Sequence, residues 1–209
     1  WTLAGPDLRK LAAGLGMAGL PAGPFDLRGR LRREPRVSRL DDVRGTVAGA
    51  DVRVSGRIGD EPLRGTTLDL DLEGPRLEAF AGLLPDYKLP SGEFRVAGAL
   101  ALTPTRLKLT GMRVTAAGAQ GTVDADLELP LSAVRGEFLV AAKGKDVTPF
   151  LPRLGNLRPA RVPFDLRVRG RAQGGTWQLD EAEFNTDAGR VSGSGKLDWA
   201  PDFSATALK

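Results

Sequence analysis

The sequence predicts a mainly β fold: a long antiparallel meander of about twelve strands, curled into an open groove, with one short helix in each of three repeats. Three observations predict it. One stretch of the 209-residue chain occurs three times, apolar and polar side chains alternate along most of it, and 27 glycines and 15 prolines supply tight turns. A β-sandwich or a closed barrel is the alternative, because the same alternation marks any half-buried sheet.

The repeat sets the domain organisation. Each copy opens with a glycine and reaches a phenylalanine 20 residues later, by the differences 25 − 5, 94 − 74 and 164 − 144. Successive glycines are 74 − 5 = 69 and 144 − 74 = 70 residues apart. We therefore expect one continuous array over 1–209, with repeats at 5–73, 74–143 and 144–209 and with 1–4 as the end of a preceding repeat.

Each repeat is expected to begin with a helix of about two turns, which is too short to be stable without a surface to lie on. Pro6 and Pro75 suit the first helical position, where a missing N–H costs nothing. Pro149 and Pro152 weaken the prediction of the third helix. The apolar stripes at helical spacing are Leu8, Leu11, Ala12 and Leu15; Leu77, Phe80, Ala81 and Leu84; and Val147, Phe150, Leu151 and Leu154.

Strands follow the helix in series in each repeat. Short connections such as Ala48-Gly49 indicate hairpins and therefore an antiparallel sheet. The second strand of each repeat slips phase, in the first repeat at 40–43, and a β-bulge there would restore the facing. The expected strands are 25–33, 36–48, 50–59 and 64–73; 93–102, 105–116, 119–129 and 135–143; and 163–172, 176–187, 190–199 and 202–208.

Strict alternation predicts that the sheet has one apolar face and one wet face. Phe25 and Leu27, for example, alternate with Asp26 and Arg28. The residues alone leave open whether the apolar side chains fill a closed interior or line an open trough. The candidate lining residues are Phe25, Leu27, Leu31, Val52, Val54, Ile58, Leu68, Leu70, Leu72, Phe94, Val96, Leu100, Val123, Leu127, Phe138, Val140, Phe164, Leu166, Val168, Leu197 and Trp199.

Composition argues against an enzyme. The chain has no Cys and no His, which removes the usual zinc ligands, thiol nucleophiles and histidine acid–base catalysts. Acidic pairs such as Asp69 and Asp71 lack the spacing of a calcium loop and are most simply solvated charge. We therefore expect no catalytic residue, no metal and no cofactor.

The distribution of charge and of apolar residues limits which partners can be expected. The net charge is +4, but the arginines are scattered and form no basic groove around aromatic residues, so we expect no nucleic-acid partner. No apolar run approaches the roughly 20 residues that cross a membrane.

The chain begins within one predicted strand and stops at the end of another. We therefore expect adjoining repeats at both ends in a longer parent protein, and missing targeting signals carry no weight.

One extended stretch carries a family resemblance. It runs from Gly5-Pro6-Asp7-Leu8 through the apolar helix to 25–29 (FDLRG) and then to 40–56 (LDDVRGTVAGADVRVSG), and weaker copies lie at 109–126 and 179–195. In these glycines and aliphatic residues, over essentially its whole length, the chain resembles the AsmA-like proteins of Gram-negative envelopes.

The resemblance implies a function. AsmA-like proteins resemble repeating-β-groove, bridge-like lipid-transfer proteins that an N-terminal helix holds in the inner membrane and that extend through the periplasm. The chain is then expected to be an internal segment of such a parent. Its apolar groove would shield phospholipid acyl chains between the inner and outer membranes and serve outer-membrane biogenesis. The alternative is a structural or adhesive periplasmic or extracellular β-repeat protein with no ligand.

Overall fold

The computed structural model of the chain describes residues 1–14, 21–35, 37–59, 65–83, 89–129, 135–150, 161–174, 176–198 and 207–208. Its internal contacts divide the chain into two compact units, Trp1–Thr103 and Pro104–Lys209. This division falls inside the second predicted repeat. The organisation into three repeats therefore stays a prediction of the sequence.

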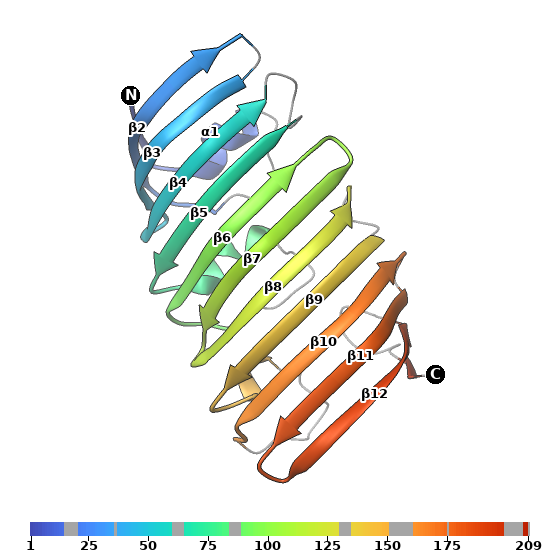
Figure 1. The fold of residues 1–209 in the computed structure, drawn as a ribbon. Helices are drawn as coiled ribbons and strands as arrows, with labels where there is room; N and C mark the ends of the chain where they lie inside the picture. Colours follow the sequence, from blue (N-terminus) through green and yellow to red (C-terminus); the bar gives the residue numbers. More distant parts are fainter. Residues whose placement is uncertain are drawn as a thin grey trace. The chain divides into compact units, whose positions relative to one another are not determined.

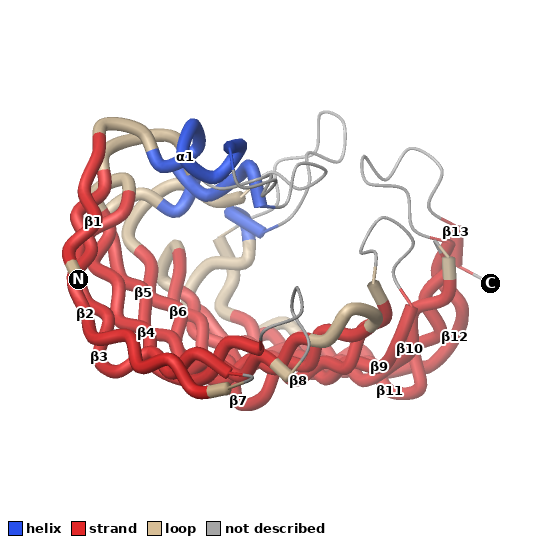
Figure 2. The backbone as a smooth tube through the Cα atoms, turned by 90° about the horizontal axis from the view of Figure 1, so that it is seen from above, coloured by secondary structure: helices blue, strands red, loops and turns tan. Residues whose placement is uncertain are grey.

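Unit 1 is a sheet in which each described strand pairs antiparallel with the next strand along the chain (Figure 1). Helix α1 (Leu8–Gly14) follows the first strand, and the 3₁₀ helix η1 (Leu77–Leu83) follows the fifth. The sheet bends toward the face on which α1 lies (Figure 2). The strands are β1 (Thr2–Gly5), β2 (Phe25–Glu34), β3 (Val37–Val47), β4 (Ala50–Gly59), β5 (Thr66–Gly74) and β6 (Phe94–Leu102).

Unit 2 has the same architecture, again with antiparallel pairing in chain order. A single turn of 3₁₀ helix, η3 (Thr148–Phe150), follows β9. The strands are β7 (Arg106–Ala116), β8 (Ala119–Glu128), β9 (Arg135–Gly144), β10 (Phe164–Gln173), β11 (Thr176–Thr186), β12 (Gly189–Asp198) and β13 (Ala207–Leu208).

The predicted fold class is confirmed: the chain is mainly β, an antiparallel meander with very little helix. Within the described part of each unit, the first and last strands do not pair with each other, so neither sheet closes into a barrel. The bounds of β2 to β12 lie within two residues of the predicted ranges. The last predicted strand, 202–208, is described only at its end, and Leu15, Leu84, Leu151 and Leu154 of the helix stripes lie outside the described residues.

A β-bulge interrupts the second strand of each repeat, as the sequence predicted. Asp42 in β3 and Gly111 in β7 take left-handed backbone conformations at these bulges, with φ of 53° and 57°. The bulge brings residues three positions apart, such as Leu40 and Val43, to the same face of the sheet. The register shifts lie between Leu40 and Val43, between Leu109 and Met112, and between Leu179 and Ala182.

The helical segments are held at one end of the sheets in the same way in every repeat. The first apolar residue of each segment donates a backbone hydrogen bond to the loop that precedes the next strand. The same segment packs on the phenylalanine that begins that strand. The bonds are Leu8 to Gly23 (3.0 Å), Leu77 to Gly92 (3.0 Å) and Val147 to Val162 (3.2 Å), and the packed pairs are Leu8 with Phe25, Phe80 with Phe94, and Val147 with Phe164.

Candidate functional site

The apolar face of the unit 1 sheet is the candidate site. Cross-strand partners point to the same side of a sheet, so the register arranges its side chains in rows that run from strand to strand. From the helix-covered end of the strands to the opposite end, the rows are Gly5, Phe25, Val47, Ala50, Gly74 and Phe94; Leu3, Leu27, Gly45, Val52, Leu72 and Val96; Gly29, Val43, Val54, Leu70 and Gly98; Leu31, Leu40, Gly56, Leu68 and Leu100; and Arg33, Ser38, Ile58, Thr66 and Leu102.

Unit 2 carries a second apolar face with the same number of rows. From the end that η3 covers, they are Ala116, Ala119, Gly144, Phe164, Thr186 and Gly189; Val114, Gly121, Ala142, Leu166, Phe184 and Val191; Met112, Val123, Val140, Val168, Ala182 and Gly193; Leu109, Ala125, Phe138, Gly170, Leu179 and Gly195; and Leu107, Leu127, Gly136, Ala172, Trp177 and Leu197.

The structure places the predicted lining residues on these two faces. Twelve of them, from Phe25 to Leu100, lie on the face of unit 1, and seven, from Val123 to Val168, lie on the face of unit 2. Leu197 is placed only by its register opposite Trp177. Trp199 lies outside the described residues. Whether a ligand occupies either face stays a prediction.

The first row differs from the rest because the helical segments cover it. Phe25, Phe94 and Phe164 are buried, Phe94 to only 3% exposure. The rings of Phe80 and Phe94 meet edge to face with centroids 5.3 Å apart. These three phenylalanines therefore seat the chain's own helical segments, and the surface open to a ligand begins with the second row.

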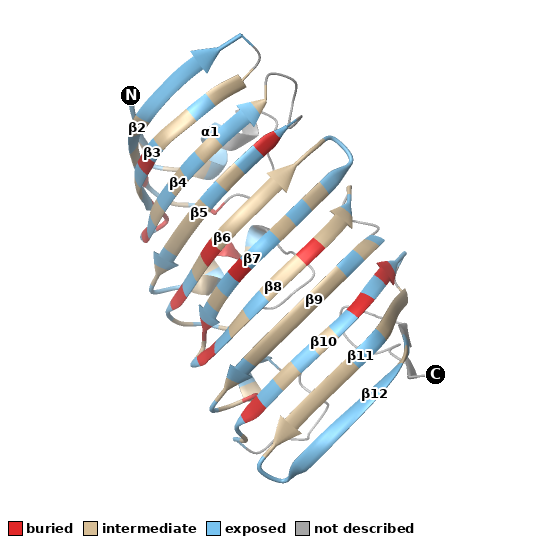
Figure 3. Cartoon of the chain, in the orientation of Figure 1, coloured by how far each residue is buried: buried red, intermediate tan, exposed pale blue. Residues whose placement is uncertain are grey.

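Beyond the first row the apolar side chains are mostly half-buried. Leu27, Val54 and Leu70 are of this kind, and β6 and β9 show the same intermediate burial along most of their length (Figure 3). Leu31 is 52% exposed and Val191 is 70% exposed. Contiguous apolar surface left in contact with water is typical of a surface that binds something.

The sequence prediction missed several residues of the two faces, and the bulges explain most of them. Where a bulge inserts a residue, the positions that face the apolar side switch from odd to even numbers or the reverse. Counting alternate residues along the strand therefore failed, and the second strand of each repeat was left out of the predicted lining. The recurrence of Leu40, Leu109 and Leu179 at the repeat spacing was the signal that would have found them. The missed side chains on these strands are Leu40, Val43, Leu107, Leu109, Met112, Val114, Trp177, Leu179 and Phe184.

The opposite face of each sheet is wet, and several of its charges are paired across strands. Arg95 donates to Asp71 at 2.8 Å, and Arg106 donates to Asp126 at 2.9 Å. The hydrogen bond and charge of Asp71 raise the pKa of Arg95 above its ordinary value. Alternation thus separates a charged outer face from the apolar face, as predicted.

The described residues offer little else on which chemistry could be built. Among them, no group of three or more His, Cys, Asp and Glu side chains is placed to hold a metal ion. The helices within the described ranges are all too short or too polar to span a bilayer. The site is therefore an extended apolar surface on an open antiparallel meander.

Comparison of the chain with protein-family models, with curated proteins and with solved structures finds no match. The protein is thus defined by its architecture: a mainly β antiparallel meander that does not close and that presents an apolar face in each unit. The resemblance to AsmA-like proteins stays a proposal.

Proposed function

We propose that the chain is a segment of a lipid-transfer scaffold whose apolar faces shield phospholipid acyl chains from water. The observation that carries the proposal is the second to fourth rows of each face, whose side chains are apolar and mostly only partly covered; Val43, Met112 and Ala125 are the buried exceptions. An acyl chain laid on them is stabilised by about 0.8 kcal/mol for each methylene removed from water.

The sameness of the rows suits transfer better than storage. Among the described residues, the second to fourth rows are apolar side chains and glycines that recur from strand to strand, with no polar side chain to fix an acyl chain at one place. A lipid on such a surface meets similar contacts at each step and can slide. The headgroup would stay in water at the rim.

The cellular setting rests on the AsmA-like resemblance. In this proposal the parent protein is anchored in the inner membrane, this segment lies in the periplasm between adjoining repeats, and phospholipid moves between the inner and outer membranes. The resemblance rests on glycines and aliphatic residues at fixed positions within the predicted repeat, such as those of 40–56.

Photo-crosslinking tests the proposal directly. A benzophenone amino acid at Leu70, on the apolar face, is compared with one at Asp69, the next residue along β5 on the wet face. After the protein has been purified from cells, mass spectrometry should find phospholipid adducts at Leu70 and none at Asp69. Equal labelling at the two positions, or a preparation that carries no phospholipid and takes up none from vesicles, would favour the ligand-free structural repeat instead.

A further inference from the structure

The outer edge of β1 carries backbone groups that no described strand satisfies. Among the described strands, β1 pairs only with β2. Trp1 and Gly29 exchange two backbone hydrogen bonds, of 2.9 and 3.1 Å. The backbone groups of successive residues in an antiparallel strand point to opposite sides, so those of Thr2 and Ala4 point away from β2. β1 therefore offers two residues to which a further strand can bond.

β12 has an open edge of the same kind. One side of β12 pairs with β11 along most of the strand, whereas the other side pairs with β13 only at Leu197 and Asp198. Within the described residues, 189–196 have no strand on that side, and they are mostly exposed (Figure 3). Val191 is 70% exposed, and a Cβ added at Gly193 would meet no atom within 4 Å.

The repeat spacing shows that these two edges are of matching types. β1 corresponds to the second half of β5, since 74 − 5 = 69, and its glycine pairs with a phenylalanine in the same way. β12 corresponds to β8 and β4, since 189 − 119 = 70 and 119 − 50 = 69. Within the chain, β5 pairs with β4 and β9 pairs with β8. A strand of the β12 type is therefore the neighbour that fits the outer edge of β1.

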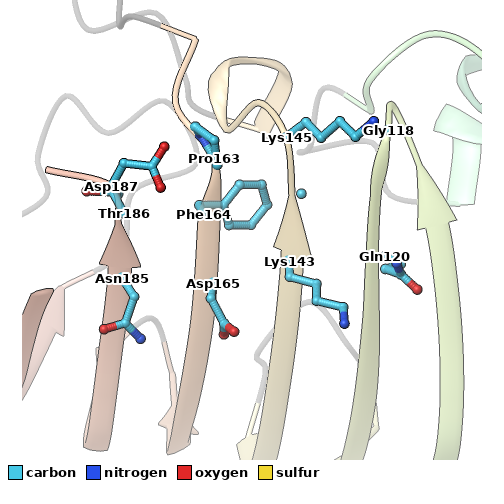
Figure 4. A pocket seen from close by; sticks show the side chains of 11 residues that line it. Gly118, Gln120, Lys143, Lys145, Pro163, Phe164, Asp165, Asn185, Thr186 and Asp187 are labelled. Atoms are coloured by element: carbon cyan, nitrogen blue, oxygen red, sulfur yellow. The ribbon is translucent and has the colours of Figure 1, made fainter. Parts of the chain in front are cut away.

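The register of the pairs within the chain carries over to β1 and β12. In unit 2, Gln120 of β8 lies opposite Lys143 of β9, and Figure 4 shows the two side chains on adjacent strands. The repeat spacing converts this pair into Arg190 opposite Ala4, since 190 − 120 = 70 and 143 − 4 = 139, the sum of the two repeat spacings. The partners that follow are Ala4 with Arg190, Leu3 with Val191, Thr2 with Ser192, and Trp1 with Gly193.

This register brings exposed apolar side chains together. Leu3 is 42% exposed and Val191 is 70% exposed. Their counterparts Leu72 and Val52 have a strand on each side and are half-buried. Pairing β1 with β12 would give Leu3 and Val191 the neighbour that each lacks, and apolar surface would leave water.

Trp1 and Gly193 are complementary in the same register. Trp1 is 47% exposed and lies beside Gly29 of β2. On its other side it would lie beside Gly193, where the structure leaves space for a large side chain. An aromatic ring that packs over a glycine of the neighbouring strand is a recognised way to stabilise a sheet edge.

We propose that two copies of the chain associate head to tail, with β1 of one copy added antiparallel to β12 of the next. Because the two surfaces differ, the contact is heterologous, and every copy keeps one edge open for another copy. The product is an open chain of copies that lengthens as the concentration rises. An adjoining repeat of a longer parent protein would use the same edge in the same register. The association requires no lipid.

Disulfide formation between two single-cysteine variants tests the register. The chain has no Cys, so Leu3→Cys and Val191→Cys each introduce a single thiol. Residues in a non-hydrogen-bonded antiparallel pair have Cα atoms about 4.5 Å apart, within the range that a disulfide spans. Under oxidising conditions the mixed variants should form a heterodimer at least about tenfold faster than Leu3→Cys mixed with Arg190→Cys, whose thiol points to the other face.

Two results of the disulfide experiment would overturn the proposal. Equal rates for the two mixtures would show that the strands do not meet in this register. A homodimer of Leu3→Cys that forms as fast as the heterodimer would show that β1 pairs with β1 instead. Circular dichroism of each variant checks that the exposed substitutions leave the fold intact.

Sedimentation velocity measures the association itself. The average mass of the lipid-free chain should rise with concentration beyond that of a dimer. Val191→Lys should weaken association by at least about tenfold, because its charge would be desolvated against Leu3. Ser192→Lys, one residue along β12 on the other face, is the matched control and should have little effect. A chain that stays monomeric up to its solubility limit, a closed dimer, or equal loss in both variants would contradict head-to-tail pairing.

Self-association and lipid binding have separate readouts. The disulfide at Leu3 forms in lipid-free protein, whereas phospholipid adducts at Leu70 report binding on the apolar face. Failure of head-to-tail pairing and failure of the acyl-binding proposal are therefore distinguishable.

Discussion

The ring of Phe94 on β6 covers Gly74, its cross-strand partner on β5: a Cβ at residue 74 would lie 3.0 Å from the ring and 2.7 Å from the Cβ of Ala50. The same pairing recurs at Gly144 with Phe164, and at Gly5 with Phe25. The ring of the recurring phenylalanine thus packs on the backbone of the recurring glycine, and the helical segment packs on the other side of the ring.

Gly144→Ala should destabilise unit 2 by about 1–3 kcal/mol, because the new Cβ would lie 2.8 Å from both Phe164 and Ala119 in a packed site. Urea denaturation followed by circular dichroism measures the change. Gly193→Ala, at a strand position with no atom within 4 Å of the added Cβ, is the control and should be neutral or stabilising. Equal stability of the two variants would show that the ring does not need glycine beneath it.

Phe80→Ala should cost about 3–5 kcal/mol, because this buried side chain joins η1 to Phe94. Hydrogen exchange should also show faster exchange of the Leu77 amide, which is bonded to the Gly92 carbonyl. Phe150→Ala provides the comparison, since Phe150 is 42% exposed and should cost much less. A larger loss at Phe150 than at Phe80 would contradict the packing described for the helical segments.

Asp146 should have a pKa below the ordinary aspartate value of 3.8, because the side chain and the backbone N–H of Thr148 both favour its ionised form. The N–H donates to the carboxylate at 2.8 Å. Since the pKa is lowered in the folded state, the stabilisation of η3 is fully present above about pH 4 and is lost as the pH falls through the folded-state pKa. Carbon-detected NMR titration of the carboxyl measures it.

The Thr148→Ala variant should raise the pKa of Asp146 toward 3.8, because it removes the hydroxyl that is the largest cause of the shift. Thr122→Ala, on the wet face of β8, should leave the titration of Asp146 unchanged. A wild-type pKa at or above 3.8 would count against the capping role.

Val54→Glu should reduce phospholipid uptake by about tenfold, because a charge in the middle of the apolar rows would have to be desolvated by an acyl chain. Ser55→Glu adds the same charge one residue along β4, on the wet face, and should have little effect. Uptake of fluorescent phospholipid from vesicles compares the two variants. Equal loss for both would indicate a general effect of charge and would argue against binding on the apolar face.

The sequence alone determined the fold class, the strand ranges and the two faces of the sheet. Neighbouring residues along a strand such as 25–33 point to opposite faces, so the polarity of each side chain is enough to assign its face. The chain's repeat spacing likewise located the helical segments. Pro149 lies inside η3, which is a single turn, in keeping with the weak prediction for the third helix.

Only the tertiary structure decided which apolar side chains are covered. Phe94 and Val96 alternate in the same way and look equivalent in the sequence, yet Phe94 is buried under Phe80 whereas Val96 is only partly buried. The sequence predicted the phase slip at 40–43, but the predicted lining left out the side chains of the bulged strands, whose register is set by their partner strands. Coverage and register depend on contacts between residues far apart in the chain, and alternation, which compares nearest neighbours, carries no information about them.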